Sequence, residues 1–296
     1  MRWYFALDEP GANGQTGEDA KTAVRSALAV GGLEPCLLYH GKPHALCTWM
    51  QRQGVRVIDA APSFLDTIRH AQAAGAYRPH SIGHWLRVMI QQIEQARDYV
   101  LYTDCDIIFL KRFDWSQIRP RFFAAAPAFR PDNWNYFNAG VMVLNVPAMR
   151  STYPALESHI RARILSGEHP SYDDETALNE AYRGHWDRLQ PALNWKPYWG
   201  YSSAAIVLHF HGPKLNALES MAAGDWSADN PTADTYQRLL TGHRFAYQAW
   251  LTALGDRLQL ADPALAIRHV NTAAALSRLR PAAPDLSFLD FKMFPE

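Results

Sequence analysis

Cysteine is scarce in this sequence, which contains only Cys36, Cys47 and Cys105. An odd number cannot all pair within the chain and their spacing forms no metal-binding cluster, which argues against a disulfide scaffold or a zinc module. A long apolar run is also missing near the start, because Asp8 and Glu9 follow an apolar stretch of five residues. That stretch is too short for a signal peptide or a membrane span. We therefore expect a cytoplasmic protein.

An excess of charge of either sign is absent too. Lys plus Arg and Asp plus Glu each total 29 residues, so no bulk basic charge points to nucleic acid as a partner. The sequence shows no internal repeat and no low-complexity tract. Aromatic residues are plentiful, because the sequence contains 10 tryptophans and 13 tyrosines. Such a composition suits both a buried core and a surface that stacks on sugars or bases.

The first part of the sequence, up to about residue 95, alternates short apolar runs with amphipathic segments. The pattern predicts strands at Trp3–Leu7, Pro35–Tyr39 and Val55–Asp59 and helices at Asp19–Val30, Leu46–Gln53 and Ile82–Gln95. Strands that alternate with helices are typical of a doubly wound α/β sheet. The loop that begins at Asp8-Glu9-Pro10-Gly11 lies where such sheets bind ligands.

The second half predicts further elements. We expect strands at Tyr99–Leu110, Phe122–Ala128, Gly140–Val146 and Ala204–Phe210 and helices at Pro154–Leu165 and Ser171–Tyr182. Ser171 and Asp174 have the spacing of a capping box at the start of the second helix. From Asn230 the chain is expected to be helical to about Leu260, with a break near Gly242. These patterns predict an α/β domain at residues 1–215 and a helical C-terminal extension at 216–296, within one structural unit.

The C-terminal extension carries no motif. Arg268, Arg278 and Arg280 suit weak peripheral association with the inner face of a membrane, whereas the acidic residues near them also suit a solvated helix face. The Pro-rich end, residues 281–296, is expected to be a docked or mobile tail. The sequence does not indicate an oligomeric state.

Two carboxylates, Asp104 and Asp106, interrupt the apolar run at 99–110. At this spacing a strand exposes both on one face. Burying two ionised carboxylates together is costly, because the like charges repel and lose hydration, so such a pair usually holds a cation or a proton. Carboxylate oxygens are ligands that suit magnesium, calcium or manganese. The alternative is a strand-ending turn with solvated carboxylates.

Further polar residues stand at the predicted ends of strands and helices. His209 precedes a turn, His211-Gly212-Pro213-Lys214, whose cation and backbone amides suit a diphosphate, although a core histidine is the simpler reading of His209 alone. Asn138 precedes a strand. Asp174 and Glu175 open a helix, where acidic residues also complement the helix dipole. The aromatic residues of 194–201 suit either stacking on a sugar or packing under a loop.

The order of these motifs resembles glycosyltransferase family 8, retaining enzymes that include glycogenin-like proteins and bacterial lipopolysaccharide galactosyl- and glucosyltransferases. Asp104-Cys105-Asp106 is similar to the Asp-x-Asp motif of metal-dependent members, and the resemblance spans roughly residues 1–214. The other matching segments are Arg87 in the preceding helix, Phe137-Asn138-Ala139-Gly140-Val141, Asp174-Glu175 with Ala177-Leu178-Asn179, and His209-Phe210-His211-Gly212. The resemblance implies a GT-A fold, a Rossmann-like mixed sheet with helices on both faces.

The resemblance also implies a hexosyl transfer from a UDP-sugar, of the UDP-glucose or UDP-galactose type, to a glycan or lipid-linked saccharide in polysaccharide biosynthesis. It implies roles for individual residues. Asp104, Asp106 and His209 would hold Mn2+ (or Mg2+), and Lys214 and the turn at Gly212 would contact the diphosphate. Ala6 and Asp8 would bind the uracil. Arg87 and Asn138 would position the donor sugar, and Asp174 would contact the sugar hydroxyls.

Some positions depart from the family pattern. Glu175 stands where members commonly have Gln, and the turn at Gly212–Leu215 is shorter than usual. An acidic residue expected soon after the Asp-x-Asp motif is missing from 124–128, although Asp132 lies nearby. Retaining transfer can proceed by front-face attack, or through a covalent glycosyl-enzyme for which Glu175 would be the nucleophile.

Two alternatives stay open at this stage. A sugar-nucleotide nucleotidyltransferase shares the sheet and the metal carboxylates, but its glycine- and basic-rich phosphate loop is missing after the first strand, at residues 8–14. A catalytically inactive partner that binds a nucleotide sugar would retain the same motifs without turnover.

Overall fold

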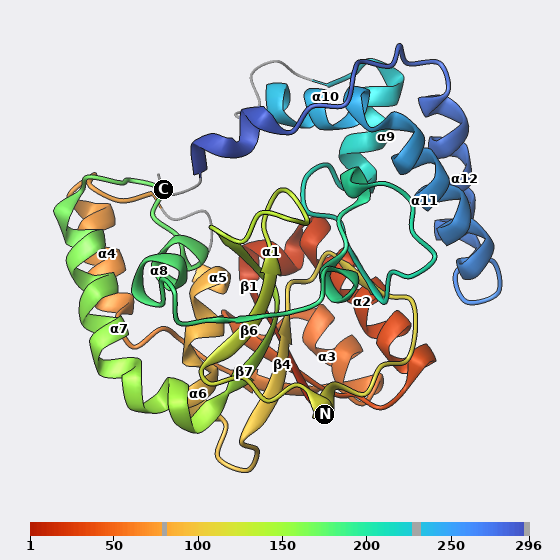
Figure 1. Ribbon diagram of the computed structural model, residues 1–296. Helices are drawn as coiled ribbons and strands as arrows, with labels where there is room; N and C mark the ends of the chain where they lie inside the picture. Colours follow the sequence, from red (N-terminus) through yellow and green to blue (C-terminus); the bar gives the residue numbers. More distant parts are fainter. Residues whose placement is uncertain (79–81, 227–231, 293–296) are drawn as a thin grey trace.

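The computed structural model describes residues 1–78, 82–226 and 232–292, with side chains up to residue 289. The helix start expected at Asn230 and Pro231 lies outside the described residues. The side chains of two acidic tail residues, Asp290 and Glu296, are not described either. Among the described residues, seven strands form the main sheet in the order β3-β2-β1-β4-β7-β6-β8. Of these, β1, β4, β6 and β7 run through the middle of the molecule in Figure 1. The bounds are β1 Arg2–Asp8, β2 Glu34–His40, β3 Arg56–Asp59, β4 Tyr99–Thr103, β6 Phe123–Pro127, β7 Phe137–Asn145 and β8 Asp187–Arg188.

The sheet is mixed, as the family resemblance implied. β1, β2, β3 and β4 run parallel, whereas β7 is antiparallel to both β4 and β6. β1 sends Trp3 and Phe5 to one face of the sheet and Tyr4 to the other, because successive side chains of a strand alternate. All three are buried, so both faces must be covered by helices.

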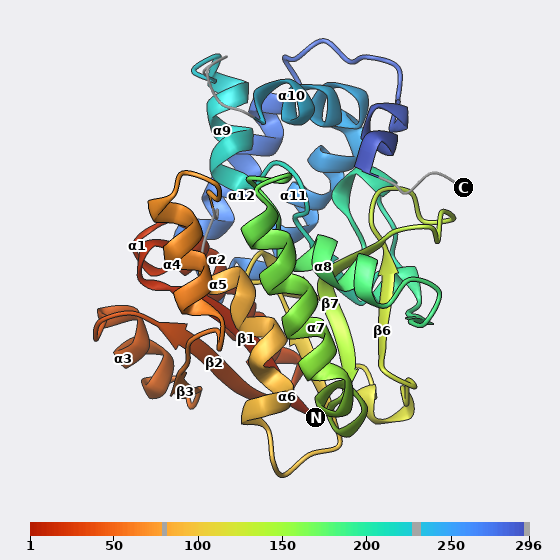
Figure 2. The ribbon, with the colours of Figure 1, turned by 90° about the vertical axis from the view of Figure 1, so that its left-hand side faces the viewer.

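Different helices cover the two faces (Figures 1 and 2). α2 (Gln15–Val30) and α3 (Ala45–Arg52) pack on the Trp3 face, where Val24 and Met50 are buried. α4 (Leu65–Ala73), α7 (Val146–Ser166) and α8 (Asp174–Ala181) pack on the Tyr4 face, where Ile68 and Ile160 are buried. The expected α/β architecture with helices on both faces is therefore confirmed.

The run at 99–110 is not one continuous strand. β4 ends at Thr103, and β5 (Ile107–Phe109) joins a separate sheet, antiparallel to β9 (Val207–His209). The N–H of Asp104 still donates to the carbonyl of Gly140 in β7 (2.8 Å), whereas the carbonyl of Asp106 accepts from Phe210 N (2.9 Å). The chain thus changes hydrogen-bonding partners between the two carboxylates.

Three local predictions need correction. The helix expected at 82–95 is two short helices, α5 (Ile82–Trp85) and α6 (Ile90–Ile93), joined by a 3-10 turn at Leu86–Met89. Asn138 lies inside β7 rather than before it, since pairing with β6 already begins at Phe137. The capping box is wrong because α8 is capped by Asp173, whose carboxylate accepts from Thr176 N at 2.8 Å.

Other element ends also differ. α1 (Glu9–Asn13) replaces the loop expected after the first strand, because Asp8 caps it and Pro10 suits a first helical turn. α7 begins at Val146 rather than Pro154, since the side chain of Asn145 accepts from Ala148 N at its start.

The C-terminal helices pack together at one end of the molecule (Figure 1). They are α9 Leu215–Ala223, α10 Ala233–Gly242, α11 Arg244–Leu258 and α12 Pro263–Leu276, so the break near Gly242 is confirmed. Their core also includes Leu208 and Phe210 from the segment around β9, which ties them to the sheet region. In the tail, Leu289 is buried in the same core, so this part is docked.

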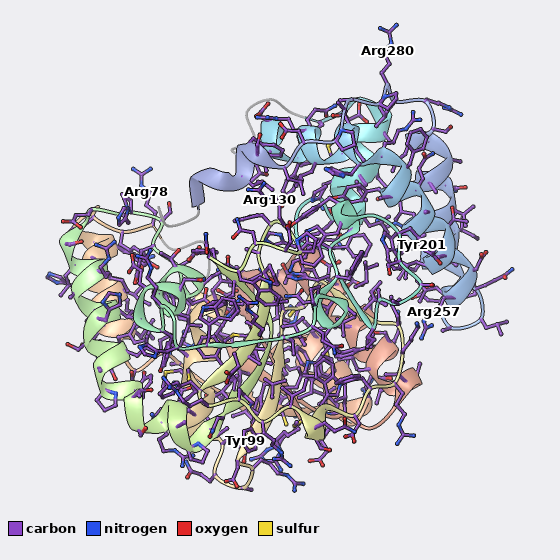
Figure 3. The ribbon with its side chains drawn as sticks, viewed as in Figure 1. Arg78, Tyr99, Arg130, Tyr201, Arg257 and Arg280 are labelled. Atoms are coloured by element: carbon purple, nitrogen blue, oxygen red, sulfur yellow. The ribbon has the colours of Figure 1, made fainter. Side chains whose placement is uncertain are left out.

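The basic residues of the C-terminal helices differ in their surroundings. Arg268 of α12 forms a two-pronged contact with Glu219 of α9, at 2.7 and 2.9 Å. Arg280 points away from the molecule (Figure 3). Across the described part of the chain, no helix is both long enough and apolar enough to cross a membrane.

Candidate metal and nucleotide-sugar site

The interrupted strand brings two carboxylates and an imidazole together. Asp104 follows β4, Asp106 precedes β5, and His209 ends β9 directly opposite Ile107 of β5. His209 Nε2 lies 3.2 Å from Asp106 Oδ1 and 3.9 Å from Asp104 Oδ2. One ligand atom from each side chain falls within 4.8 Å of the other two. This donor set fits a divalent cation such as manganese, which accepts carboxylate oxygen and imidazole nitrogen together.

Lys214 completes the charged centre. Its ammonium lies 2.7 Å from Asp106 Oδ2, so the two oxygens of that carboxylate face Lys214 and His209 separately. Burial favours the protonated acid, but Lys214 and His209 hold the pKa of Asp106 well below its usual range. Burial likewise opposes the charge on Lys214, but Asp106 raises the pKa of that ammonium above its ordinary value. Both groups are therefore charged at neutral pH.

Asp104 uses its second oxygen for a different contact. Arg87 Nη2 donates to Asp104 Oδ1 at 2.8 Å, and the hydroxyl of Tyr102 donates to the same oxygen at 3.0 Å. Arg87 also donates to the carbonyl of Ala139 (2.6 Å) and pairs with Asp174. Although burial opposes its charge, Asp104 and Asp174 raise the pKa of Arg87 above its ordinary value. The Oδ2 atom of Asp104 is thereby left facing His209.

Asp174 and Glu175, at the start of α8, point to different partners. Asp174 is buried against Arg87, and burial raises its pKa to about 7 while Arg87 opposes the rise. Glu175 Oε2 accepts from Asn138 Nδ2 at 2.9 Å and from Ala139 N at 2.8 Å. Through Glu175, α8 therefore holds the β7 residues Asn138 and Ala139, and through Asp174 it holds Arg87.

The expected uracil residues lie at the end of β1. Asp8 is buried, and its two oxygens accept from Gly11 N (2.9 Å) and Gly83 N (3.1 Å). The carbonyl of Ala6 accepts a contact from Cys105 Sγ at 3.4 Å, which places β1 beside the Asp-Cys-Asp turn. Ala6 thus adjoins the Asp-Cys-Asp turn through its carbonyl, and Asp8 ends the same strand two residues later.

The turn at Gly212 requires a glycine, because its φ of +112° lies in a region that L side chains rarely adopt. It directs Lys214 back toward Asp106, and Lys214 Nζ also contacts the carbonyls of Phe210 and Gly212. A cavity of about 220 Å³ opens beside Asp106 and Lys214, between α2 and α12. The charged centre is therefore accessible from this side.

The aromatic stretch at 194–201 mainly packs. Tyr198 is buried, and Lys196 is fully buried with its ammonium 4.2 Å from the ring centre of Trp199 and 2.7 Å from the carbonyl of Pro127. Burial lowers the pKa of Lys196 well below its ordinary value. Tyr201, by contrast, is about half exposed. Packing under a loop accounts for most of this stretch.

Comparisons with known proteins give matches in structure only. No protein-family model matches the chain, and no curated protein matches it in sequence. The galactosyltransferase LgtC, solved with donor and acceptor sugar analogues, matches with a TM-score of 0.55 and 20% identity over 81% of this chain and 95% of LgtC. The fold is that of the GT-A glycosyltransferases.

Two further GT-A structures support the assignment of the fold. An active-site mutant of LgtC, in which a glutamine is replaced with glutamate, matches with a TM-score of 0.53 and 20% identity, over 81% of this chain and 95% of that one. The apo form of the glycosyltransferase GlyE of Streptococcus pneumoniae TIGR4 matches with a TM-score of 0.51 and 16% identity, over 86% of this chain and 63% of GlyE. The resemblance expected from the motifs is thus confirmed for the GT-A fold.

Within this GT-A fold, the structure gathers most of the predicted residues. Asp104, Asp106 and His209 meet in one cluster that Lys214 joins, and Arg87 links that cluster to α8. Sequence reasoning missed Asn194, which is buried between Asn138 and His209. Its position at the start of an aromatic stretch carried no signal for this contact, because the partners lie 15 and 56 residues away.

Arg87→Met is expected to lower the free energy of unfolding by about 3 kcal/mol, because it leaves the buried carboxylate of Asp174 without its charged partner. Urea denaturation measures the change. Arg97→Met is the matched control, since Arg97 pairs with Glu34 where both side chains are about half exposed, and its loss is expected to cost less than about 1 kcal/mol. Equal costs for the two variants would contradict a structural role for the Arg87 pair.

Proposed function

We propose that this protein is a metal-dependent retaining glycosyltransferase that moves a hexose from a UDP-sugar to a hydroxyl group of a glycan or lipid-linked saccharide. The observation that carries the proposal is the cluster of Asp104, Asp106 and His209 with Lys214 beside it. Two acidic ligands, an imidazole and an ammonium suit a divalent cation that shares a diphosphate with a lysine. The GT-A fold adds support, since the galactosyltransferase LgtC shares it.

In the proposed reaction, the bond between the sugar C1 and the β-phosphate oxygen breaks, and a bond from the acceptor oxygen to C1 forms on the same face. The departing phosphate oxygen takes the acceptor proton. A bound divalent cation would supply Lewis-acid stabilisation of the leaving diphosphate. Lys214 donates to the same oxygens, and its contribution grows as negative charge develops on them. The turn at Gly212 holds Lys214 in place.

The donor sugar is proposed to lie on the α8 side of the metal cluster. Arg87 joins Asp104 to Asp174, and Asn138 joins β7 to Glu175, so these five side chains border one region. Asn138, Asp174 and Arg87 would then orient sugar hydroxyls. The uracil is proposed to lie at the end of β1, beside Ala6 and Asp8. Residues 1–215 would form the catalytic unit, with the helices of 216–296 beside the acceptor.

Glu175→Gln is expected to keep turnover within about tenfold of the parent if attack is front-face, because a glutamine carbonyl can still accept from Asn138 and Ala139. The measurement is UDP release with an acceptor present. Loss of nearly all turnover in Glu175→Gln, together with a glycosylated peptide containing Glu175 in the parent protein, would instead establish a covalent intermediate.

A donor screen tests the proposed function. UDP-glucose, UDP-galactose and their N-acetyl forms are incubated with the protein and Mn2+, and released UDP is followed with and without a chelator. Release from one or more donors that the chelator abolishes is the expected result. Tight UDP binding with no release and no transfer to any glycan would identify a binding partner instead of an enzyme.

A further inference from the structure

A chain of buried hydrogen bonds connects Glu175 on α8 to His209 in the metal cluster. Asn138 Oδ1 accepts from Gly140 N at 3.1 Å and from Asn194 Nδ2 at 2.9 Å. Asn194 Oδ1 lies 2.9 Å from His209 Nδ1. Asn138, Asn194 and His209 are each at most 2% exposed, so water does not compete for these contacts.

Backbone groups determine the direction of every bond in this chain. A backbone N–H can only donate, so the atom of Asn138 that faces Gly140 must be its oxygen. The amide nitrogen of Asn138 then faces Glu175, whose same oxygen also accepts from Ala139 N. Each amide orientation in the chain follows from these fixed donors.

The same logic extends to the imidazole. Asn194 must offer its NH2 group to Asn138 Oδ1, so its oxygen faces His209 Nδ1. An oxygen there can only accept, and the ring must therefore carry its proton on Nδ1. In the neutral ring, Nε2 then presents a lone pair toward Asp106 Oδ1 at 3.2 Å and Asp104 Oδ2 at 3.9 Å. A divalent cation among these three atoms would take the place of the proton that an imidazolium ring carries on Nε2.

We propose that Asn194 is a positioning residue that holds His209 in the Nδ1–H tautomer and so prepares Nε2 to bind the metal. The proposal rests on the metal site of the proposed function. Hydrogen bonds to the far nitrogen of a ligating histidine fix both the tautomer and the ring orientation, and losing such a partner typically weakens metal binding. Through Asn138, the same residue also connects the metal cluster to the donor-sugar side.

The first test is the tautomer of His209 in the metal-free protein. Histidine is labelled with 15N, the His209 signals are assigned by their loss in His209→Gln, and long-range 1H–15N correlations are recorded at mildly alkaline pH. The expected result is that Nδ1 carries a proton. A ring protonated on Nε2 alone would overturn the proposal, and this measurement does not depend on the folding of an Asn194 variant.

The second test compares two substitutions by calorimetric titration with Mn2+. Asn194→Asp loses the NH2 group that donates to Asn138 but keeps an oxygen acceptor for His209, so it is expected to bind Mn2+ within about threefold of the parent protein. Asn194→Leu removes that acceptor at similar size and is expected to bind Mn2+ about 10- to 100-fold more weakly. A purely structural residue would alter stability in the folded variants while Mn2+ affinity stayed equal in both, which would overturn the proposal.

His209→Ala separates this inference from the proposed function. If His209→Ala loses Mn2+ binding while Asn194→Leu does not, only the role of Asn194 fails. If neither His209→Ala nor Asp106→Asn changes Mn2+ affinity, the metal site itself is wrong.

Discussion

Asp106→Asn is expected to lower metal-dependent release of UDP from a UDP-sugar by about a thousandfold. One oxygen of Asp106 faces His209 in the metal cluster and the other pairs with Lys214 at 2.7 Å. Asparagine removes the charge, so the cluster loses an anionic ligand and Lys214 loses its counter-ion. Initial rates of UDP release at saturating Mn2+ measure the effect.

Asp59→Asn is a matched control for this prediction, because Asp59 is an exposed carboxylate at the end of β3 in the main sheet. Its rate is expected to stay within about twofold of the parent, as for surface substitutions distant from a site. An Asp106→Asn protein that is folded and retains more than about a tenth of the parent rate would contradict the assignment of Asp106 as a metal ligand.

Gly140→Ala is expected to weaken Mn2+ binding at least about 100-fold and to lower the free energy of unfolding by about 1–3 kcal/mol. A Cβ atom at this position would lie 2.2 Å from His209 Cε1 and 2.9 Å from Asn138 Oδ1. The histidine ring or the β7 backbone must therefore shift, which disturbs the position of His209 against Asp104 and Asp106. Calorimetric Mn2+ titration and urea denaturation measure the two effects.

Gly14→Ala provides the comparison for Gly140→Ala. A Cβ at Gly14 would be no closer than 3.5 Å to its nearest neighbour, and the backbone there is extended. We expect a cost below about 1 kcal/mol and unchanged Mn2+ affinity. Unchanged Mn2+ affinity in Gly140→Ala would contradict the ring position that underlies the metal cluster.

Local patterns in the sequence were sufficient to predict the sheet. The apolar run at Trp3–Leu7 can only be buried on both faces of a sheet, and it forms β1 with alternating side chains on two cores. Asp104 and Asp106 stood out because carboxylates are costly beside a buried strand. The two carboxylates therefore predicted a cation from local sequence alone, whereas the contact with His209 is visible only in the structure.

Features that depend on distant partners could not be predicted in the same way. The break between β4 and β5 arises because Asp106 bonds to Phe210 rather than to β7, a choice that no local pattern encodes. The burial of Asp8 depends on the backbone of Gly83, across 75 residues. The sequence around Asn194 shows no helical or strand periodicity that marks the residue. Its contacts appear only once the fold brings Asn138 of β7 and His209 of β9 to it.

The central claim is that Asp104, Asp106 and His209 hold a divalent cation that shares a nucleotide diphosphate with Lys214. The most direct measurement is anomalous diffraction from crystals of the protein grown with Mn2+ and UDP. We predict a manganese peak enclosed by Asp104, Asp106 and His209 Nε2, with the UDP diphosphate between that peak and Lys214. Well-ordered UDP bound elsewhere, or bound with no manganese among these residues, would contradict the claim.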